Sequence, residues 1–191
     1  MKICMIITAA GMSKRQRINK LLIHSGNETI IEKTVNNLLN NNFNVFVIVG
    51  HQKELIIPRL SERFRNEIKI VNNLNYKTGI ASSLIAGIKA AGDDYDYYGF
   101  CNGDKPFIKV KTVETLVKYL TDNEPQILVP MYQDVSGHPT FFSKEFVDDF
   151  SLISGDTGGR EIIKKHPEAV TYLPLNDEGI ILDMDKYLHN D

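Results

Sequence analysis

Residues 3–11 read Ile-Cys-Met-Ile-Ile-Thr-Ala-Ala-Gly, a continuous apolar run that ends in a loop of small residues. Residues 45–50, Val-Phe-Val-Ile-Val-Gly, repeat this organisation, and shorter apolar runs occur at residues 68–71, 97–102 and 126–130. Strands that are buried on both faces of a sheet lack the polar alternation of half-exposed strands, and they are typical of parallel sheets. These runs therefore predict the strands of a mostly parallel sheet.

Longer segments with a helical spacing of apolar residues separate these runs. Residues 31–39, 81–88 and 113–120 each place apolar side chains on one helical face, which can cover one face of a sheet. Alternating strands and helices with right-handed crossovers build an open sheet with helices on both faces. We predict an α/β, Rossmann-like fold.

The pattern changes after residue 130. Gly137-His138-Pro139 precedes Thr140-Phe141-Phe142, which indicates a turn into a strand. The glycine-rich segment 155–159 then predicts the start of a helix from about Arg160. We interpret this half as a small β insertion over one edge of the sheet, and residues 1–191 as a single domain.

Composition excludes several functions. The chain has 191 residues, of which 42% are hydrophobic and 24% charged, and its formal net charge is −2. This charge predicts no broad attraction to nucleic acid or to an anionic membrane, and no run approaches the roughly 18 apolar residues of a membrane span. We expect a cytoplasmic protein in which Cys4 and Cys101, each within an apolar run, are buried thiols.

Ligands of open α/β sheets bind beyond the carboxyl ends of the strands. The loop after the first strand, Thr8 to Lys20, combines small residues with Ser13 and several cations, Arg15 among them, and this combination suits a polyphosphate. It has neither the three glycines of a dinucleotide fingerprint nor the Gly-Lys-Ser/Thr of a P-loop. A solvated basic loop is the alternative interpretation.

Two further loops carry polar residues. Asp104, which follows Asn102-Gly103, could hold Mg²⁺ together with substrate phosphates, although Asp beside Gly and Pro is also common in turns. The segment from Asn73 to Ser83 contains hydroxyl groups near a helix start, where they either cap the helix or contact a base or phosphate.

Together these segments resemble a known family. Thr8-Ala9-Ala10-Gly11-x-Ser13-x-Arg15, followed by Lys20, is similar to the signature loop of the MobA-like NTP transferases, and its Thr-Ala-Ala-Gly form resembles that of the molybdenum cofactor cytidylyltransferases. The middle, metal-binding and later motifs of that family have counterparts in the same order, at Asn73-x-x-Tyr76-x-x-Gly79-x-x-Ser82-Ser83, Gly103-Asp104-x-Pro106, Gly137-His138-Pro139, Gly155-Asp156-x-Gly158-x-Arg160 and Asp183-Met184-Asp185.

The resemblance implies a nucleotide-diphospho-sugar transferase-like fold and a Mg²⁺-dependent transfer of CMP from CTP to the terminal phosphate of a molybdopterin-type cofactor. It implies catalytic roles for Lys20, Arg15 and Asp104, and metal ligation by Asp104 with Asp183 or Asp185. It assigns the nucleotide to Thr8, Ala9, Ala10, Gly11, Ser13, Asn73, Gly79, Ser82, Ser83 and Gly103. It assigns the acceptor to His138, Asp156 and Arg160, and it implies a client molybdenum enzyme as a partner.

The chain departs from the family pattern at three places. Gln16-Arg17 stands where a glycine is usual, Lys105 stands where Gln or Met is common, and Lys186-Tyr187 follows Asp185 in place of Thr-Pro. Two alternatives stay open: a cytidylyltransferase that acts on a sugar or polyol phosphate, because the first loop is shared across that wider group, and a non-catalytic protein that binds or delivers the cofactor, because of the departures at Arg17 and Lys105.

Overall fold

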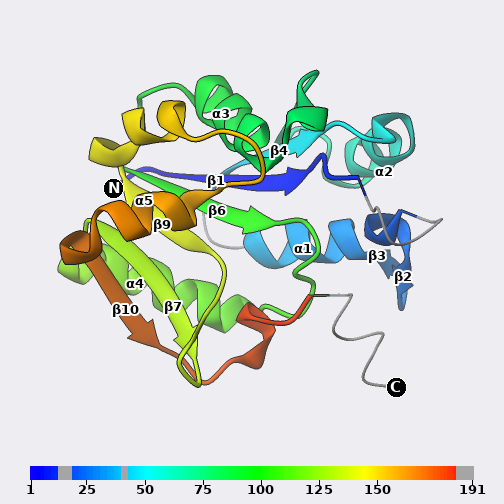
Figure 1. The fold of residues 1–191 in the computed structure, drawn as a ribbon. Coiled ribbons are helices and arrows are strands. Elements are labelled where there is room, and N and C mark those ends of the chain that lie inside the picture. The colour runs from blue at the N-terminus through cyan, green and yellow to red at the C-terminus, as the bar shows by residue number, and fades with distance from the viewer. Residues whose placement is uncertain (13–18, 40–42, 184–191) are drawn as a thin grey trace.

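The computed structural model describes residues 1–12, 19–39 and 43–183. Within these ranges an eight-stranded sheet has the order β10-β7-β9-β6-β1-β4-β5, with β8 paired to β7 (Figure 1). Its strands are β1 (Ile3–Ala9), β4 (Asn44–Val49), β5 (Ile68–Asn72), β6 (Tyr97–Asn102), β7 (Ile127–Tyr132), β8 (Val135–Ser136), β9 (Thr140–Ser143) and β10 (Val170–Pro174). β1 is parallel to both β4 and β6, and β4 is parallel to β5. The predicted mostly parallel α/β sheet is confirmed.

Helices cover both faces of the sheet (Figure 1). They are α1 (Ile30–Leu39), α2 (Lys53–Phe64), α3 (Ile80–Ala91), α4 (Val110–Asn123) and α5 (Gly159–Lys165). Short 3₁₀ turns are η1 (Lys20–Leu22), η2 (Tyr76–Thr78), η3 (Lys144–Phe146), η4 (Asp148–Leu152), η5 (Pro167–Ala169) and η6 (Glu178–Ile180), and β2 (His24–Ser25) pairs with β3 (Glu28–Thr29). The sequence pattern predicts α1, α3, α4 and α5 but not α2, which contains Pro58.

The predicted placement of the later half of the chain is wrong in one respect. β9 lies inside the sheet, antiparallel to both β6 and β7, rather than over one edge. Phe141 and Phe142, which alternate between the two faces, are both fully buried there, so the strand is apolar on both sides and its backbone is paired on both sides. The edge is formed instead by β10, parallel to β7, and the sequence analysis did not predict this strand.

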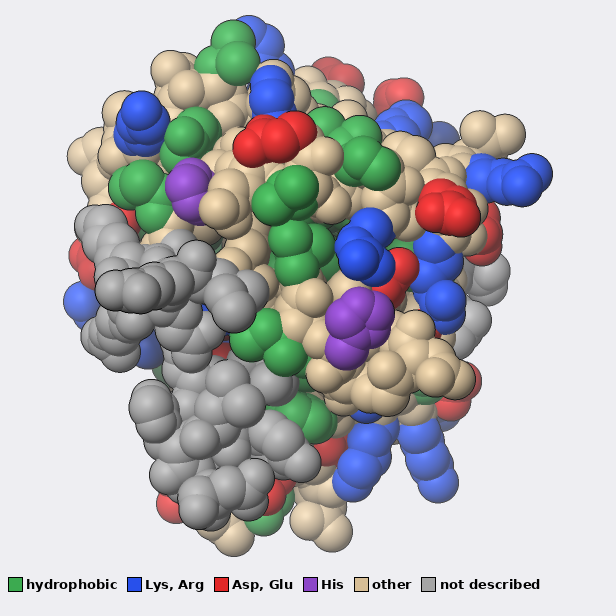
Figure 2. All heavy atoms as spheres, turned by 90° about the vertical axis from the view of Figure 1, so that its right-hand side faces the viewer, with side chains coloured by type: hydrophobic (Ala, Val, Ile, Leu, Met, Phe, Trp, Pro, Cys, Tyr) green, Lys and Arg blue, Asp and Glu red, His purple; other side chains and the backbone are tan. Residues whose placement is uncertain are grey.

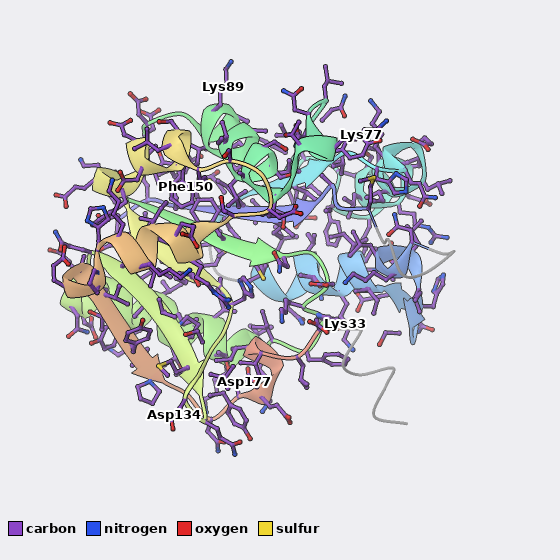
Figure 3. All side chains as sticks on the ribbon, in the orientation of Figure 1. Lys33, Lys77, Lys89, Asp134, Phe150 and Asp177 are labelled. Carbon is purple, nitrogen blue, oxygen red and sulfur yellow. The ribbon has the colours of Figure 1, made fainter. Side chains whose placement is uncertain are left out.

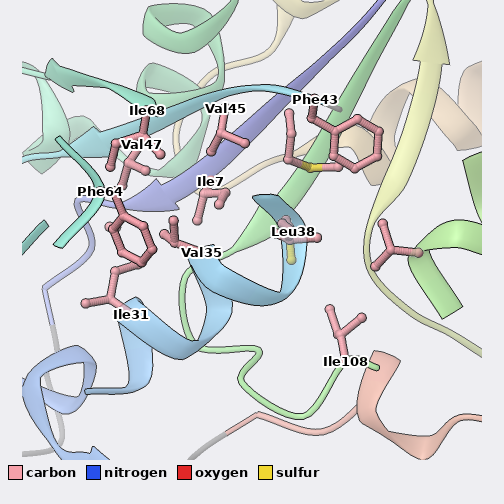
Figure 4. Packing of buried hydrophobic residues seen from close by; sticks show 14 of the residues in the cluster. Ile7, Ile31, Val35, Leu38, Phe43, Val45, Val47, Phe64, Ile68 and Ile108 are labelled. Carbon is pink, nitrogen blue, oxygen red and sulfur yellow. The ribbon is translucent and has the colours of Figure 1, made fainter. Parts of the chain in front are cut away.

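Alternation along the central strands divides the core into two layers, because successive side chains point to opposite faces. Met5 and Ile7 of β1 pack with the layer under α1, α2 and α4, whereas Cys4 and Ile6 pack with the layer under α3 and α5. Figure 4 shows part of the first layer, with Ile7, Val45 and Val47 of the sheet facing Ile31 and Val35 of α1 and Phe64 of α2.

The prediction that both cysteines are buried thiols is confirmed. Cys4 and Cys101 are free and buried, and burial raises the pKa of both, that of Cys4 to about 12. Both thiols therefore remain protonated at neutral pH.

The carboxyl ends of β1 and β6 lie side by side and bring two of the predicted loops together. The backbone N–H of Gly103 donates to the carbonyl of Thr8 at 2.9 Å. A β-carbon at Gly103 would lie 2.8 Å from the end of the Ile31 side chain and 3.1 Å from that carbonyl, so a larger residue here would require both neighbours to shift. Figure 2 views the side toward which β1 and β6 run in Figure 1, where charged and hydrophobic side chains lie close together.

Candidate active site

A first cavity of about 500 Å³ lies at the carboxyl ends of β1 and β6. It brings together many of the predicted site residues from loops that are distant in sequence. Thr8, Ala9, Gly11, Lys20, Gly79, Ser83, Gly103, Asp104 and Asp156 all line it. Ser13, Arg15 and Asp185 lie outside the described residues.

An ion pair joins Lys20 and Asp104, two of the residues predicted to be catalytic. Lys20 Nζ lies 2.6 Å from Asp104 Oδ2, with 21% and 13% of the two side chains exposed. Lys20 begins η1, whose N-cap, Asn19, accepts a hydrogen bond at 3.1 Å from the backbone N–H of Leu21. The cap fixes the start of this turn and with it the position of the lysine.

The other oxygen of Asp104 fits a cation. Asp104 Oδ1 is buried and has no hydrogen-bond partner among the described residues, and an unpaired buried polar atom costs about 1–3 kcal/mol. The described ranges contain no group of three or more His, Cys, Asp or Glu side chains that could hold a metal ion. Mg²⁺ often needs only one or two carboxylates beside substrate phosphates, so Asp104 could serve as one protein ligand.

Two of the residues predicted for the metal and the nucleotide, Asp183 and Ala10, do not line the first cavity. Asp183 is described but is not among the residues that line the first cavity. Ala10 is buried, and its carbonyl accepts a hydrogen bond from the backbone of His51 at 3.2 Å. Its methyl group lies beside Gly50 rather than in the lining of the first cavity.

Asn73 and Ser82 belong to a network that holds the segment before α3. Asn73 Nδ2 donates to Ser82 Oγ at 2.9 Å and to Ser83 Oγ at 3.1 Å. The hydroxyl of Ser82 is directed at the carbonyls of Gly79 and Asn75, at 2.8 and 3.0 Å. Neither Asn73 nor Ser82 lines the first cavity, whereas Ser83 does. Ser82 does not cap α3, whose N-cap is Gly79 and has no side-chain cap hydrogen bond; its hydroxyl instead ties the start of the helix to the preceding turn.

A tight backbone contact closes the wall of the cavity at Gly79. This residue has a φ of +113°, and a β-carbon there would lie 2.1 Å from the carbonyl group of Gly155. The backbone N–H of Ala81 donates to the carbonyl of Gly155 at 3.2 Å. The loop before α5 is thus docked on the start of α3, and this contact brings Asp156 to the first cavity.

A second cavity of about 630 Å³ adjoins the first and shares Thr8, Ile80 and Asn102 with it. His138 and Arg160, two of the residues predicted for the acceptor, line this second cavity, while Asp156 lines the first. Its apolar lining includes Leu84, Phe100, Val129, Phe142 and Ile163, and its polar lining includes Lys164 and Asp134. In Figure 3, Asp134 lies at the tip of the β7–β8 hairpin, on the other side of β6 from Lys77 of the first cavity.

Aromatic stacking stiffens the wall of the second cavity. The rings of Phe100 and Phe150 stack with centroids 4.6 Å apart, and Phe142 meets Phe150 edge-on at 5.1 Å. Phe150, labelled in Figure 3, comes from η4, so this turn supports the cavity from behind. The cavity therefore has a fixed apolar wall beside its cationic side chains.

His138 offers the second cavity a neutral group. Burial, with contributions from the Lys105 and Arg160 cations, lowers the pKa of His138 to about 4, although Asp104 and the Phe100 carbonyl act in the opposite direction. Its Nδ1 lies 3.4 Å from the carbonyl of Phe100. The imidazole is therefore uncharged at neutral pH, and Arg160 and Lys164 supply the positive charge in this lining.

The C-terminal segment packs behind both loops, and neither Lys105 nor the segment's own contact residues were predicted to be site residues. Lys105 is buried and donates to the carbonyl of Ile181 at 3.0 Å, and the backbone N–H of His138 donates to the carbonyl of Ile180 at 2.9 Å. Asp177, labelled in Figure 3, is also buried and accepts from Thr112 Oγ1 at 2.6 Å. No local pattern marks these contacts in the sequence, because each joins segments that are far apart along the chain.

The mostly parallel sheet is that of an open α/β protein, and the polar cleft beyond the carboxyl ends of its strands lies where such proteins bind ligands. The chain belongs to the family described as the MobA-like NTP transferase domain, whose model matches residues 5–170. It is therefore a member of a nucleotidyltransferase family.

Two curated relatives are each 26% identical to the chain. One is the molybdenum cofactor cytidylyltransferase of Escherichia coli, matched over 73% of this chain and 69% of that protein. The other is the nicotine blue oxidoreductase of Paenarthrobacter nicotinovorans, matched over 94% of this chain and 90% of that protein.

Solved structures share the fold. A nucleotidyl transferase from Methanothermobacter superposes with a TM-score of 0.82 at 18% identity, covering 99% of this chain and 95% of that one. A 4-diphosphocytidyl-2C-methyl-D-erythritol synthase from Anaerococcus prevotii superposes with a TM-score of 0.75 at 17% identity, covering 99% and 94%. In the part of the chain that the structure describes, no helix is long and apolar enough to cross a membrane.

Proposed function

We propose that this protein transfers CMP from CTP to the terminal phosphate of a molybdopterin-type cofactor and releases pyrophosphate. The observation that carries the proposal is the junction of two cavities at Thr8 and Asn102, one lined by Gly11, Lys20 and Asp104 and the other by apolar walls and two cations. The relationship to a cytidylyltransferase that acts on the molybdenum cofactor supports the same reaction.

The first cavity suits the triphosphate of CTP. A β-carbon added at Gly11 would meet no atom of the described residues within 4 Å, so among these residues the loop leaves open space in which phosphates can approach the backbone. Lys20 supplies a positive charge there, and Asp104 Oδ1 is available to a cation. We expect Mg²⁺ to bind Asp104 together with phosphate oxygens, where it would neutralise charge on the triphosphate.

The proposed chemistry requires positioning and charge neutralisation rather than a covalent intermediate on the protein. An oxygen of the acceptor phosphate attacks the α-phosphorus of CTP and forms a new P–O bond. The bond between the α-phosphorus and the oxygen that bridges to the β-phosphate breaks, and its electron pair leaves with pyrophosphate. Lys20 can stabilise the charge that develops on the leaving group, a role that Arg15 is proposed to share.

The second cavity suits an acceptor that carries both a ring system and an anionic group. Phe100, Phe142 and Val129 offer apolar surface, and Arg160 and Lys164 offer positive charge. A small sugar or polyol phosphate has no fused ring system to pack against these apolar walls. This contrast favours a phosphorylated pterin over the sugar phosphate alternative.

Nucleotide discrimination tests the proposal. Binding and pyrophosphate release are measured for CTP, GTP and ATP with Mg²⁺, first alone and then with a phosphorylated pterin or a panel of sugar and polyol phosphates. We expect turnover with CTP and the pterin. Lys20→Ala and Asp104→Ala should each reduce turnover by roughly a hundredfold or more, because each removes charge aimed at the transition state.

Other outcomes would reject the proposal in distinguishable ways. Turnover of a sugar phosphate without turnover of the pterin would reassign the acceptor. Pterin binding without CTP binding would favour a delivery protein. Because one relative is named an oxidoreductase, NADPH oxidation is measured in parallel, and oxidation in the absence of CTP turnover would reject nucleotidyl transfer. Near-full activity of both alanine variants would reject the site.

A further inference from the structure

Asn102 occupies the boundary between the two cavities. It is the last residue of β6, and with Thr8 and Ile80 it lines both of them. Asn102 directly precedes Gly103 in the chain, and the sequence pattern predicted no role for it. Because the donor and the acceptor of a transfer reaction must meet where their binding sites join, a side chain at this boundary is placed to contact the reacting groups.

The amide of Asn102 is oriented by one hydrogen bond. Thr8 and Asn102 are register partners on the parallel strands β1 and β6, and Thr8 Oγ1 donates to Asn102 Oδ1 at 3.1 Å. The carbonyl oxygen of the amide is thereby turned toward Thr8. Within residues 1–12, 19–39 and 43–183, no protein group accepts a hydrogen bond from the Nδ2 amino group, so both of its N–H donors are available to a ligand.

We infer that Asn102 binds the phosphate monoester of the acceptor through hydrogen bonds donated by Nδ2. The inference rests on the proposed function and adds to it a residue that determines how the acceptor is held. Phosphate oxygens are strong hydrogen-bond acceptors, and a neutral amide can orient the attacking oxygen without cancelling the negative charge that makes it a nucleophile. The cations Lys20 and Arg160 line one cavity each, whereas the neutral amide lines both.

The test measures the acceptor phosphate separately from the nucleotide. The protein is saturated with Mg²⁺ and α,β-methylene CTP, which cannot be cleaved at the reacting bond, and phenyl phosphate is titrated by calorimetry. Asn102→Asp keeps the size of the side chain but replaces the donors with a negative charge. We expect it to weaken phenyl phosphate binding by roughly a hundredfold, and Asn102→Ala by about tenfold. In each variant the affinity for α,β-methylene CTP should fall by clearly less than the affinity for phenyl phosphate, because Asn102 lines the first cavity but is proposed to bind the acceptor.

A second pair of variants tests the orientation of the amide and applies even if Asn102→Asp does not fold. Thr8→Val removes the hydroxyl that fixes the amide, whereas Thr8→Ser retains it. We expect Thr8→Val to weaken phenyl phosphate binding and Thr8→Ser to bind it as the wild type does.

Unchanged phenyl phosphate binding in the Asn102 variants, or no binding to the wild type, would overturn the inference while CTP turnover still supported the proposed function. An equal loss of both ligands would overturn it too, since Asn102 would then belong to the nucleotide. A wild-type protein that binds no CTP would overturn both proposals.

Discussion

Replacement of Lys20 by methionine should strengthen metal binding in the absence of nucleotide. Lys20 Nζ lies 2.6 Å from Asp104 Oδ2, so a divalent cation that binds Asp104 must compete with an ammonium group already in place. A hydrogen bond between charged groups contributes about 1.5–3 kcal/mol, and both side chains are shielded enough, at 21% and 13% exposed, for this range to apply. Removal of the competitor should therefore raise the affinity for the metal by about ten- to hundredfold.

The assay titrates Mn²⁺, as a paramagnetic substitute for Mg²⁺, into nucleotide-free protein and measures free Mn²⁺ by electron paramagnetic resonance. With α,β-methylene CTP present, we expect the wild type to bind Mn²⁺ more tightly than Lys20→Met does. Lys20 is then needed to neutralise the triphosphate, so Lys20→Met should bind the nucleotide at least about tenfold more weakly. Lys118→Met is the matched control, since Lys118 is 77% exposed in a helical ion pair with Asp122, and it should leave both affinities unchanged.

The reasoning would be refuted if Lys20→Met bound Mn²⁺ no more tightly than the wild type. That result would mean that the ion pair does not restrict access of the metal to Asp104. A loss of Mn²⁺ binding in the variant would contradict it further, because it would show that the lysine helps to form the metal site in the absence of nucleotide.

Three other predictions concern loops around the cavities. Gly11→Ala should leave the free energy of unfolding within about 0.5 kcal/mol of wild type, because its β-carbon would meet no atom of the part of the chain that the structure describes, yet it should weaken CTP binding at least about tenfold; calorimetry showing undiminished affinity would exclude phosphate contact there. Asp177→Ala should cost about 3 kcal/mol in urea unfolding, because Asp177 is buried and accepts from Thr112 Oγ1 and the backbone of Lys109, and a cost below 1 kcal/mol would contradict this role. The pKa of His138 is lowered from 6.5 to about 4, so the unfolded chain binds a proton that the folded protein excludes, and stability should fall as pH decreases through this range. His138→Gln should show a smaller decrease between pH 7 and about 4.5 in the same assay, and an equal decrease would assign the effect to other groups.

Much of the fold could be predicted from local sequence. Strands buried on both faces must be apolar at consecutive positions, so the runs that became β1, β4 and β6 were visible without knowledge of their neighbours. The stripes of α1, α3 and α4 were visible for the same reason, since each covers a sheet with one face. α2 was missed because Pro58 interrupts an otherwise helical segment, which tertiary contacts nevertheless hold in place through buried Ile56 and Leu60.

The residues of the candidate site also fall into those that could be predicted from the sequence and those that could not. The residues of the first loop and of Gly103-Asp104 were found because chemistry-bearing side chains follow predicted strands, and parallel strands end at one edge of the sheet. The contacts of Asn73 and Ser82 were not predicted. A polar side chain near a helix start can bond either to the backbone or to a ligand, and only the structure shows which partner it has.

The sequence by itself therefore determined that this chain forms a mostly parallel α/β sheet with polar loops beyond its strands, since burial and periodicity are local properties. Only the tertiary structure decided that β9 enters the sheet between β6 and β7, that Lys20 pairs with Asp104, and that Asn102 lines both cavities. Those features arise from contacts between distant segments, whose geometry is fixed by strand order and packing rather than by the residues of any one segment.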